Sequence, residues 1–197
     1  MTSKNDIRKQ VRLLRRSLSV DDRHQHAASL YQHFHRHQFF RNSQRIAMYL
    51  SNDGELDLTP LILRAFGLKK RVFLPALHKP GYDRMVFIRY TKKSPMRNNR
   101  FGIAEPRYQN RTTITPRSLD LVLMPLVAFD KTGNRLGMGG GFYDRTFAFL
   151  GTRKHWHKPR LIGVAYDFQL IDDIPHEPWD VPLDGVVTPT TFYAFKK

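Results

Sequence analysis

Hydrophobic residues near the start of the chain recur at helical spacing. The first predicted helix covers residues 4–18, with Ser3 and Asp6 placed for a capping box at its start. Its apolar stripe consists of Ile7, Val11, Leu14 and Leu18. A second helix is predicted to start at Ser19 and to run through the segment DDRHQHAASLYQHF. The chain therefore opens with two helices.

Apolar runs of strand length follow, and they alternate with shorter helical segments. The run at residues 45–51, a helix after Thr59 and Pro60, and the run at residues 70–77 have the spacing of a β-α-β unit with parallel strands. Residues 120–129 are almost entirely apolar, which is typical of a central strand buried on both faces. Other predicted elements are a strand at residues 84–90, a short helix at YDRTFAFL, a strand at residues 160–167 and a strand around GVVTP.

This order of elements predicts the fold class. Alternating strands and helices favour one α/β domain over residues 1–197, with a mostly parallel central sheet and helices on both faces in a three-layer, Rossmann-like arrangement. Residues 92–118 interrupt the pattern because they are polar, basic and punctuated by proline, so they are predicted to form a long mobile loop. No internal repeat or linker divides the sequence.

Composition supports a globular protein and narrows its class. Of the 197 residues, 41% are hydrophobic and 12% are aromatic, which is enough for a packed core. The absence of cysteine excludes disulfides and thiolate zinc sites and fits a reducing compartment. The basic N-terminus has no apolar run of the signal-peptide type, and no window approaches the roughly 18 consecutive apolar residues of a membrane span. We expect a cytoplasmic protein without a membrane segment, and a monomer.

The net charge of +16 has three interpretations. It fits a protein that binds nucleic acid, an enzyme whose field gathers small polyanions, or a solvated and repulsive surface, and charge alone does not decide among them. Three of the cations, Lys4, Arg8 and Arg15, form a row beside the apolar stripe of the first helix. Such a row can face a ligand, or its members can simply extend their charged ends into water.

The segment RLGMGGGFYDR, residues 135–145, concentrates four glycines ahead of a predicted helix. Free N–H groups in such a turn, together with the positive end of the helix dipole, favour an anion. The segment is not a Walker A loop, which needs G-x-x-x-x-G-K-[ST]. It is not a dinucleotide fingerprint either, because position 142 is Phe and the preceding predicted strand ends several residues before Gly137. A glycine-rich hairpin or helix cap without a ligand is the structural alternative.

The residues that flank the glycines favour a phosphate ligand. Arg135 can bind phosphate through two hydrogen bonds, and Asp144 offers a hard oxygen ligand of the kind that Mg2+ uses when it bridges nucleotide phosphates. Tyr143 adds an aromatic face and a hydroxyl donor. A cation, a cradle of amides and a carboxylate in one turn match the needs of a triphosphate with its metal, so the local chemistry predicts an ATP–Mg2+ site.

Beyond this segment, several ordered motifs resemble the 5-formyltetrahydrofolate cyclo-ligase family, also called the methenyltetrahydrofolate synthetases. The longest is PLVAFDKTGNRLGMGGGFYDR, and the N-terminal pattern K-x-x-I/L-R-x(6)-R-x-x-L-S is present from Lys4 to Ser19. The others are YLSNDGELDLTPLI, KRVFLPAL, GIAEP, DLVLMPLVAFD, LIGVAYDFQL and WDVPLDGVVTP. The resemblance covers nearly the whole chain, and several motifs in matching order are more specific than one glycine-rich loop.

The resemblance implies ATP- and Mg2+-dependent conversion of 5-formyltetrahydrofolate, free or polyglutamylated, into 5,10-methenyltetrahydrofolate, ADP and phosphate. In that reaction the γ-phosphoryl group is transferred to the formyl oxygen, and the folate N10 nitrogen then closes the ring. The implied ATP-binding residues are Lys4, Arg8, Arg135, Leu136, Gly137, Met138, Gly139, Gly140, Gly141, Phe142 and Tyr143, with Arg15 as a further contact. The implied folate-binding residues are Leu50, Glu55, Met138, Gly139, Gly140, Gly141 and Phe142. The implied metal ligands are Asp144 and Asp180, and the implied catalytic residues are Tyr143 and Arg135.

One position departs from the family pattern, and two other functions stay open. Many relatives carry a basic residue within the loop, where this chain has Met138 and Gly140, so no role is assigned to a loop lysine. The charge keeps open an RNA- or DNA-binding protein, although no RNP-type string, zinc spacing or helix-turn-helix pattern occurs and nucleic acid is not expected as a partner. A related ATP-dependent enzyme acting on another amide-like substrate is the other alternative.

Three further features receive weaker interpretations. No third ligand accompanies His33 and His37 on one helix face, so a metal site at His33, His35 and His37 is not expected. Trp179 is expected to pack within the protein rather than to stack on the substrate. The candidates to bind a polyglutamate tail are the basic loop residues Lys92, Lys93, Arg97 and Arg100.

Overall fold

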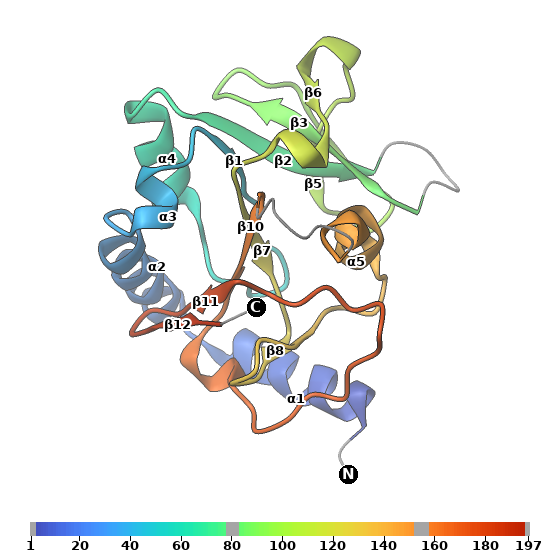
Figure 1. The fold of residues 1–197 in the computed structure, drawn as a ribbon. Coiled ribbons are helices and arrows are strands. Elements are labelled where there is room, and N and C mark those ends of the chain that lie inside the picture. Colours follow the sequence, from blue (N-terminus) through green and yellow to red (C-terminus); the bar gives the residue numbers. More distant parts are fainter. Residues whose placement is uncertain (1–2, 78–82, 152–157, 196–197) are drawn as a thin grey trace.

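The protein is built around one large twisted sheet (Figure 1). A computed structural model describes residues 3–77, 83–151 and 158–195, and within them eight strands join in the order β12-β11-β10-β7-β1-β2-β3-β6. The strands are β1 (Arg45–Ala47), β2 (Arg71–Leu77), β3 (Met85–Tyr90), β6 (Thr113–Ile114), β7 (Leu121–Pro125), β10 (Arg160–Val164), β11 (Gly185–Val187) and β12 (Phe192–Ala194).

The middle of this sheet is parallel, as the alternation of strands and helices predicts. Strand β1 pairs in parallel with β2 on one side and with β7 on the other, and β7, β10 and β11 continue in the same direction. The outer strands β12, β3 and β6 pair antiparallel. Strands β1 and β2 and the helix α4 (Thr59–Gly67) between them are the predicted β-α-β unit. The expected fold class, a mostly parallel α/β sheet, is confirmed.

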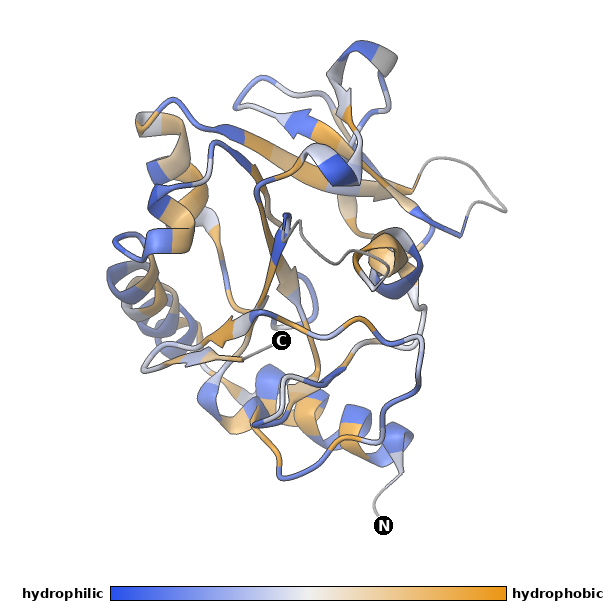
Figure 2. Cartoon of the chain, in the orientation of Figure 1, coloured by the Kyte–Doolittle hydropathy of each residue, from blue (hydrophilic) through white to orange (hydrophobic). Residues whose placement is uncertain are grey.

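Helices cover both faces of the sheet because the central strands are apolar on both sides. In β7, Leu121 and Leu123 join one core cluster and Val122 and Met124 join the other. The first core is closed by α2 (Val20–Phe34), α3 (Gln38–Arg41) and α4, and the second by α5 (Phe142–Phe147). Figure 2 shows the hydrophobic residues along the central strands and on the helices packed against them. No helix within the described residues combines the length and apolarity needed to cross a membrane.

Helix α1 (Lys4–Ser17) lies beyond the carboxyl ends of the parallel strands, below the sheet in Figure 1. It begins at the predicted capping box, in which Asp6 N donates to Ser3 Oγ at 3.2 Å. Its apolar side packs on the chain that leaves β7 and on the segment that follows β10. The cluster they form consists of Ile7, Val11, Val127, Ala128, Leu136 and Ile174.

The predicted apolar stripe of α1 is correct for Ile7 and Val11 but wrong for Leu14. Half of the Leu14 surface is exposed, at 50%, whereas Arg15 is only 1% exposed. This end of the helix faces a polar loop, where Arg15 donates to Asp53, and not an apolar face of the sheet. A buried arginine therefore stands where the periodicity predicts leucine.

The chain changes its direction of travel across the sheet between β1 and β7. From β1 the connection leads through α4 to β2 on one side, whereas β10 and β11 follow β7 on the other side. The helices that follow β1 and β7 also cover opposite faces. In parallel α/β sheets, such a change opens a crevice at the carboxyl ends of the two strands, and ligands bind there. The loops after β1 and β7 are therefore placed for function.

Two predicted strands are shorter than the apolar runs that indicate them. Of residues 45–51, only the first three belong to β1, because the chain then leaves the sheet toward the crevice. The run 120–129 is divided where Gln169 Nε2 donates to the carbonyls of Leu126 and Val127, both at 2.8 Å. The remainder of that run forms β8 (Ala128–Phe129), which pairs with β9 (Arg135–Leu136).

The prediction of a structureless loop over residues 92–118 is wrong. The segment holds β4 (Met96–Asn98), β5 (Ala104–Pro106), η1 (Asn110–Thr112), the edge strand β6 and η2 (Pro116–Ser118). The β4–β5 hairpin is built on Glu105, which is 2% exposed and accepts from Arg97 Nη2 at 2.8 Å and from Leu77 N at 2.9 Å. One buried ion pair thus organises a segment whose composition indicates a loop.

Candidate active site

The glycine-rich loop, residues 137–141, connects β9 to α5 at the edge of the crevice. A strand directly precedes it, contrary to the sequence-based prediction, because β9 ends at Leu136 and pairs with β8. The loop ends at Gly141, the N-cap of α5, with a φ of 61° in the left-handed region. A Cβ there would lie 2.5 Å from Arg145 Nη1, so this position requires glycine. The hairpin and the cap are both present, and the remaining polar groups of the loop are available for a ligand.

In the glycine-rich loop, carbonyl groups accept hydrogen bonds from arginine side chains, whereas the N–H groups have no acceptor among the described residues. Gly137 O accepts from Arg8 Nε at 2.9 Å, and Gly140 O accepts from Arg145 Nη2 at 2.5 Å. Within the described part of the chain, no N–H of residues 137–141 donates to a protein acceptor. Because α5 has only six residues, free amides and guanidinium groups contribute more to anion binding here than a helix dipole does.

Helix α1 brings one predicted cation, Arg8, to this loop and another, Lys4, to the segment that carries Asp180. The Arg8 guanidinium carbon is 3.6 Å from the point where a Cβ on Gly139 would stand. Lys4 Nζ lies 3.8 Å from Glu177 Oε1, on the segment that carries Asp180. Arg15, by contrast, lies at the other end of α1 and donates to the loop after β1, so the structure does not bring it to the glycines.

Arg135 joins α5 to the segment that carries Asp180. Its side chain is 6% exposed, and its Nη2 donates to Asp144 Oδ1 at 2.6 Å while its Nη1 donates to Val181 O at 2.6 Å. Val181 N donates to the same Oδ1 at 3.2 Å. Asp144 and Asp180 therefore approach each other from distant parts of the sequence. The two terminal nitrogens of Arg135 donate to Asp144 and Val181, so Arg135 holds Asp144 in position.

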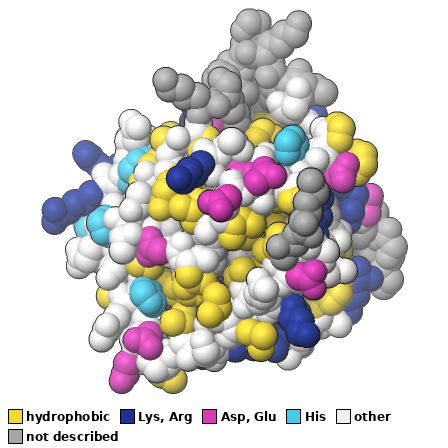
Figure 3. All heavy atoms as spheres, turned by 90° about the horizontal axis from the view of Figure 1, so that it is seen from below, with side chains coloured by type: hydrophobic (Ala, Val, Ile, Leu, Met, Phe, Trp, Pro, Cys, Tyr) yellow, Lys and Arg dark blue, Asp and Glu magenta, His cyan; other side chains and the backbone are white. Residues whose placement is uncertain are grey.

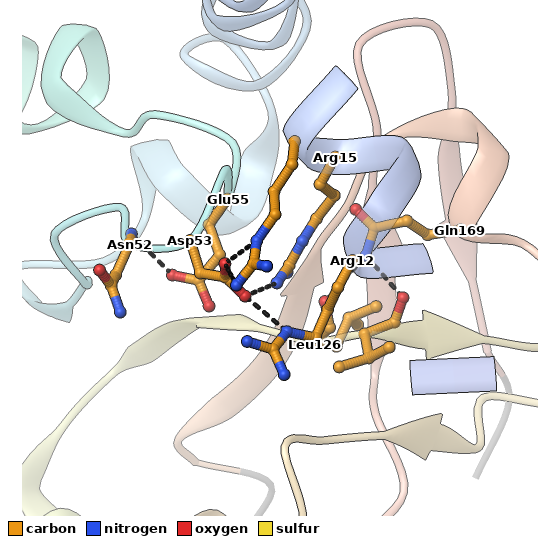
Figure 4. Close-up of polar contacts among 9 residues, drawn as sticks. Arg12, Arg15, Asn52, Asp53, Glu55, Leu126 and Gln169 are labelled. Atoms are coloured by element: carbon orange, nitrogen blue, oxygen red, sulfur yellow. Dashed lines mark hydrogen bonds and ion pairs between the residues drawn. The ribbon is translucent and has the colours of Figure 1, made fainter. Parts of the chain in front are cut away.

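On the other side of the crevice, the loop after β1 forms a tight turn from Asn52 to Glu55. Asp53 and Gly54 have φ values of 50° and 72°, and Glu55 N donates to Asn52 O at 3.0 Å, which is the pattern of a type I′ turn. Asp53 is therefore a turn residue. Glu55 Oε2 accepts from Asn52 N at 3.1 Å, so the turn also holds the carboxylate (Figure 4).

Glu55 lies close enough to Tyr143 of α5 for their charges to interact. Burial raises the pKa of the Glu55 carboxyl to about 7. Burial, and then the negative charge of Glu55, raise the pKa of the Tyr143 hydroxyl, so that the phenol stays protonated at neutral pH. Tyr49 OH, also buried, donates to Leu56 O at 2.8 Å. A carboxyl group that titrates near neutrality beside a protonated phenol is typical of a functional site.

The other implied folate contacts lie in different surroundings. Leu50 is partly buried against the first core, whereas Met138 is 53% exposed on the glycine-rich loop. The Phe142 ring lies edge-on to Phe101, with centroids 6.3 Å apart, and Arg100 Cζ is 6.0 Å from the same ring. The sequence-based prediction missed Phe101 as a neighbour of the site, because it did not include the β4–β5 hairpin.

The structure also bears on two further predictions, those for Trp179 and for the histidines of α2. Trp179 is 69% exposed, so the expectation that it packs within the protein is wrong. The histidines near the end of α2 make ring contacts: His35 stacks on Tyr31, and His37 stacks on Phe34. Among the described residues, no group of three metal-binding side chains comes together, there or elsewhere.

The donor set on the glycine side fits a magnesium nucleotide. Free amides, Lys4 and Arg8 suit the phosphates, and Asp144 and Asp180 are hard oxygen ligands of the type that Mg2+ uses when phosphates complete its shell. No other described residue bonds Asp144 Oδ2, so one oxygen of that carboxylate remains for a metal. The donors that suit phosphate therefore lie at the glycines, and the half-buried Glu55 lies on the other side.

Comparisons with known proteins identify the family of the chain. The chain matches the 5-formyltetrahydrofolate cyclo-ligase family over residues 1–189. A 5-formyltetrahydrofolate cyclo-ligase of Haemophilus influenzae is 40% identical over 186 residues, 93% of this chain and 96% of the relative, and one of Escherichia coli is 44% identical over 150 residues, 76% and 80%. The NMR structure of 5,10-methenyltetrahydrofolate synthetase from Aquifex aeolicus aligns with a TM-score of 0.82 at 30% identity, over 98% of this chain and 93% of its own. By sequence and by fold, the chain belongs to the 5-formyltetrahydrofolate cyclo-ligase family.

Proposed function

We propose that the protein converts 5-formyltetrahydrofolate into 5,10-methenyltetrahydrofolate, using ATP and Mg2+ and releasing ADP and phosphate. Family membership supports the folate reaction. The observation that carries the use of ATP is the glycine-rich loop, whose amides are free and whose carbonyls are held by Arg8 and Arg145, directly beside Asp144. Glu55 on the opposite wall supports a folate site facing that loop.

The reaction needs activation because a formyl oxygen is a poor leaving group. Transfer of the γ-phosphoryl group to this oxygen gives an imidate phosphate. The folate N10 nitrogen then attacks the activated carbon, the five-membered ring closes, and the carbon–oxygen bond breaks as phosphate leaves. Such a transfer is catalysed mainly by positioning and by stabilisation of charge, and a crevice with a nucleotide on one wall and a folate on the other provides both.

On the phosphate side, each group has a separate task. Lys4, Arg8 and the loop amides bind the phosphates, while Asp144 and Asp180 hold Mg2+, which neutralises part of the phosphate charge. Arg135 keeps Asp144 in place through their 2.6 Å ion pair. These cations meet the phosphate charge without a lysine within the loop, where this chain has Met138 and Gly140.

On the folate side, the Glu55 carboxylate accepts hydrogen bonds from the N–H donors of the pterin ring. Tyr143, whose pKa is raised so that it keeps its proton, donates to the reacting oxygens. Leu50, Met138 and Phe142 supply apolar contacts around the ring system.

A spectroscopic assay of methenyltetrahydrofolate formation tests this function. Purified protein is expected to turn over 5-formyltetrahydrofolate only when ATP and Mg2+ are both present. Asp144→Ala should lower kcat by about 100-fold or more, the typical effect of losing one stabilising group at the transition state, while the protein stays folded. Asp21→Ala on α2, outside the crevice, is the matched control and should keep its activity.

Two results would count against the proposal. A wild-type protein that forms no product with ATP and Mg2+ would contradict the function itself. Near-normal activity of Asp144→Ala would remove this carboxylate from the metal site.

A further inference from the structure

One carboxylate in the crevice bonds to three arginines of the same helix (Figure 4). Asp53 Oδ2 accepts from Arg12 Nε at 2.7 Å and from Arg15 Nη2 at 3.3 Å. Asp53 Oδ1 accepts from Arg16 Nε at 2.6 Å. We propose that Asp53 is a positioning residue for the folate, because it fixes the turn that carries Glu55 onto helix α1. This role rests on the proposed function.

Asp53 suits this place by its backbone as well as by its charge. Its φ of 50° lies in the left-handed region, which aspartate and asparagine adopt more readily than other residues with side chains. Its two oxygens together offer enough lone pairs for three guanidinium donors. Partial burial acts to raise the pKa of this carboxyl, but the hydrogen bonds and charges of Arg12 and Arg16 outweigh it and hold the pKa below its ordinary value. The carboxylate is therefore ionised at neutral pH.

The backbone next to Asp53 also rests directly on α1. A Cβ on Gly54 would lie 2.9 Å from Arg15 O, and the φ of Gly54 is 72°. The turn thus packs against the last turn of the helix with no room for a side chain at this point. The backbone of the turn already lies against α1 here, and Asp53 adds three charged hydrogen bonds between the two.

The contact between Asp53 and α1 affects the proposed substrate site through Arg15. It is 1% exposed, its Nε has no partner among the described residues, and Asp53 is the carboxylate to which its Nη2 donates. A buried cation is costly without a paired charge. If Asp53 were neutral, Arg15 would retain only the nearby charge of Glu55, and a Glu55 that pairs with Arg15 no longer offers its oxygens to a pterin ring. Asp53 therefore balances the buried charge of Arg15, which also acts on the neighbouring Glu55.

The same helix serves both walls of the crevice. The first half of α1 carries Arg8, which bonds to the glycine-rich loop, and Lys4, which lies beside Glu177 on the segment of Asp180; its second half carries the three arginines that hold Asp53. A 14-residue helix is about 20 Å long at its rise of roughly 1.5 Å per residue. Helix α1 thus fixes the position of the turn that carries Glu55 relative to the glycine-rich loop.

The variant Asp53→Asn tests the inference, because asparagine keeps the left-handed backbone and removes only the charge. Amide hydrogen exchange over residues 50–56 of the ligand-free protein should become faster. KM for 5-formyltetrahydrofolate should rise about tenfold, while kcat and KM for ATP stay within about twofold. Arg16→Gln, which removes one largely exposed arginine that contacts Asp53 Oδ1 through Nε and Nη2, should act in the same direction but less.

Asp57→Asn is the matched control. Asp57 lies on the same loop, but its Oδ1 accepts from Thr59 N at 3.0 Å at the start of α4, and within the described residues it forms no hydrogen bond or ion pair with α1. Exchange over residues 50–56 and KM for the folate should not change in this variant.

The possible failures are distinguishable. Unchanged exchange in Asp53→Asn would overturn the inference and leave the proposed function intact, and so would faster exchange with an unchanged KM for the folate. An equal rise in both KM values would also overturn it, because it would indicate a general disturbance of the helix. A wild-type protein without turnover would contradict the proposed function and, with it, the folate role of Asp53.

Discussion

The Glu55 carboxyl is the single group whose chemistry depends most on its surroundings. Burial raises its pKa from the ordinary 4.5 to about 7, while its hydrogen bond from Asn52 N and the charge of Arg15 act in the opposite direction. The groups whose charges interact with it are Arg15, Asp53, Tyr49, Tyr143 and Tyr166. The proposed contact with pterin donors requires the ionised form, so folate binding should depend on pH near neutrality.

We expect KM for 5-formyltetrahydrofolate to rise by up to about tenfold per pH unit below pH 7 and to level off above it. Glu55→Gln should raise KM at every pH and remove this dependence. Because the folded pKa lies above the unfolded one, the ionisation of Glu55 destabilises the fold progressively from about pH 4.5 to pH 7. Glu55→Gln should therefore be more stable than the wild type at pH 8, by roughly 1–2 kcal/mol, and equally stable at pH 4. Kinetics and denaturant unfolding check both parts, and a folate KM that is flat from pH 6 to pH 8 would contradict the assignment.

Individual residues of the site could be predicted only where local chemistry or a motif marks them. The Asp53-Gly54 pair is a turn signal, and Asp144 directly follows the glycines. The bonds from Arg12, Arg15 and Arg16 to Asp53 join segments far apart in the sequence, and no spacing rule connects them. For the same reason, the sequence does not predict the partner of Arg15, which was expected near the phosphates. Its contacts depend on where the loop after β1 lies.

At the scale of elements, helix starts were predictable and strand ends were not. The capping box of Ser3 at the start of α1 is local, and it is present as the sequence predicts. Helix α2 likewise begins at the predicted Ser19, which forms a capping box with Asp22. The end of β7 depends instead on Gln169, which binds the chain from a distant turn. The β4–β5 hairpin depends on the buried Glu105. Elements that are fixed by one long-range side chain are invisible to periodicity.

The glycine-rich loop gives a test at this scale through a matched pair of substitutions. Gly141→Ala places a side chain at a left-handed φ and against Arg145, which should cost about 1–2 kcal/mol of folding stability and raise KM for ATP. Gly67→Ala at the end of α4 meets no atom within 4 Å and should be neutral or slightly stabilising. Thermal unfolding of both variants measures the difference. Equal stability of the two would contradict the strained cap at Gly141.

At the scale of the whole molecule, the parallel sheet was predictable and the position of the crevice was not. The alternation of strands and helices indicates the fold class, but the order β10-β7-β1-β2, which places the crevice between β7 and β1, follows from packing on both faces. The resemblance to a known family supplied what the order of elements could not, namely that the loops after β1 and β7 belong to one site.

The net charge of +16 is accompanied by acidic side chains on the face nearest α1 (Figure 3). The face seen from below in Figure 3 carries Asp and Glu side chains among hydrophobic ones. Several arginines are also paired with carboxylates within the fold, as at Asp53 and Glu105. A nucleic-acid backbone favours an uninterrupted basic surface, and the acidic groups of the crevice, Glu55, Asp144 and Asp180, would repel it. Under the proposed function, the charge would attract ATP and an anionic folate.

The central claim is that the formyl oxygen of the folate receives the γ-phosphoryl group in this crevice. Turnover of 5-formyltetrahydrofolate that carries oxygen-18 in its formyl group, followed by mass spectrometry of the released phosphate, tests it most directly. The account predicts that each phosphate formed with methenyltetrahydrofolate carries the labelled oxygen. Unlabelled phosphate, with the label recovered in water, would contradict it.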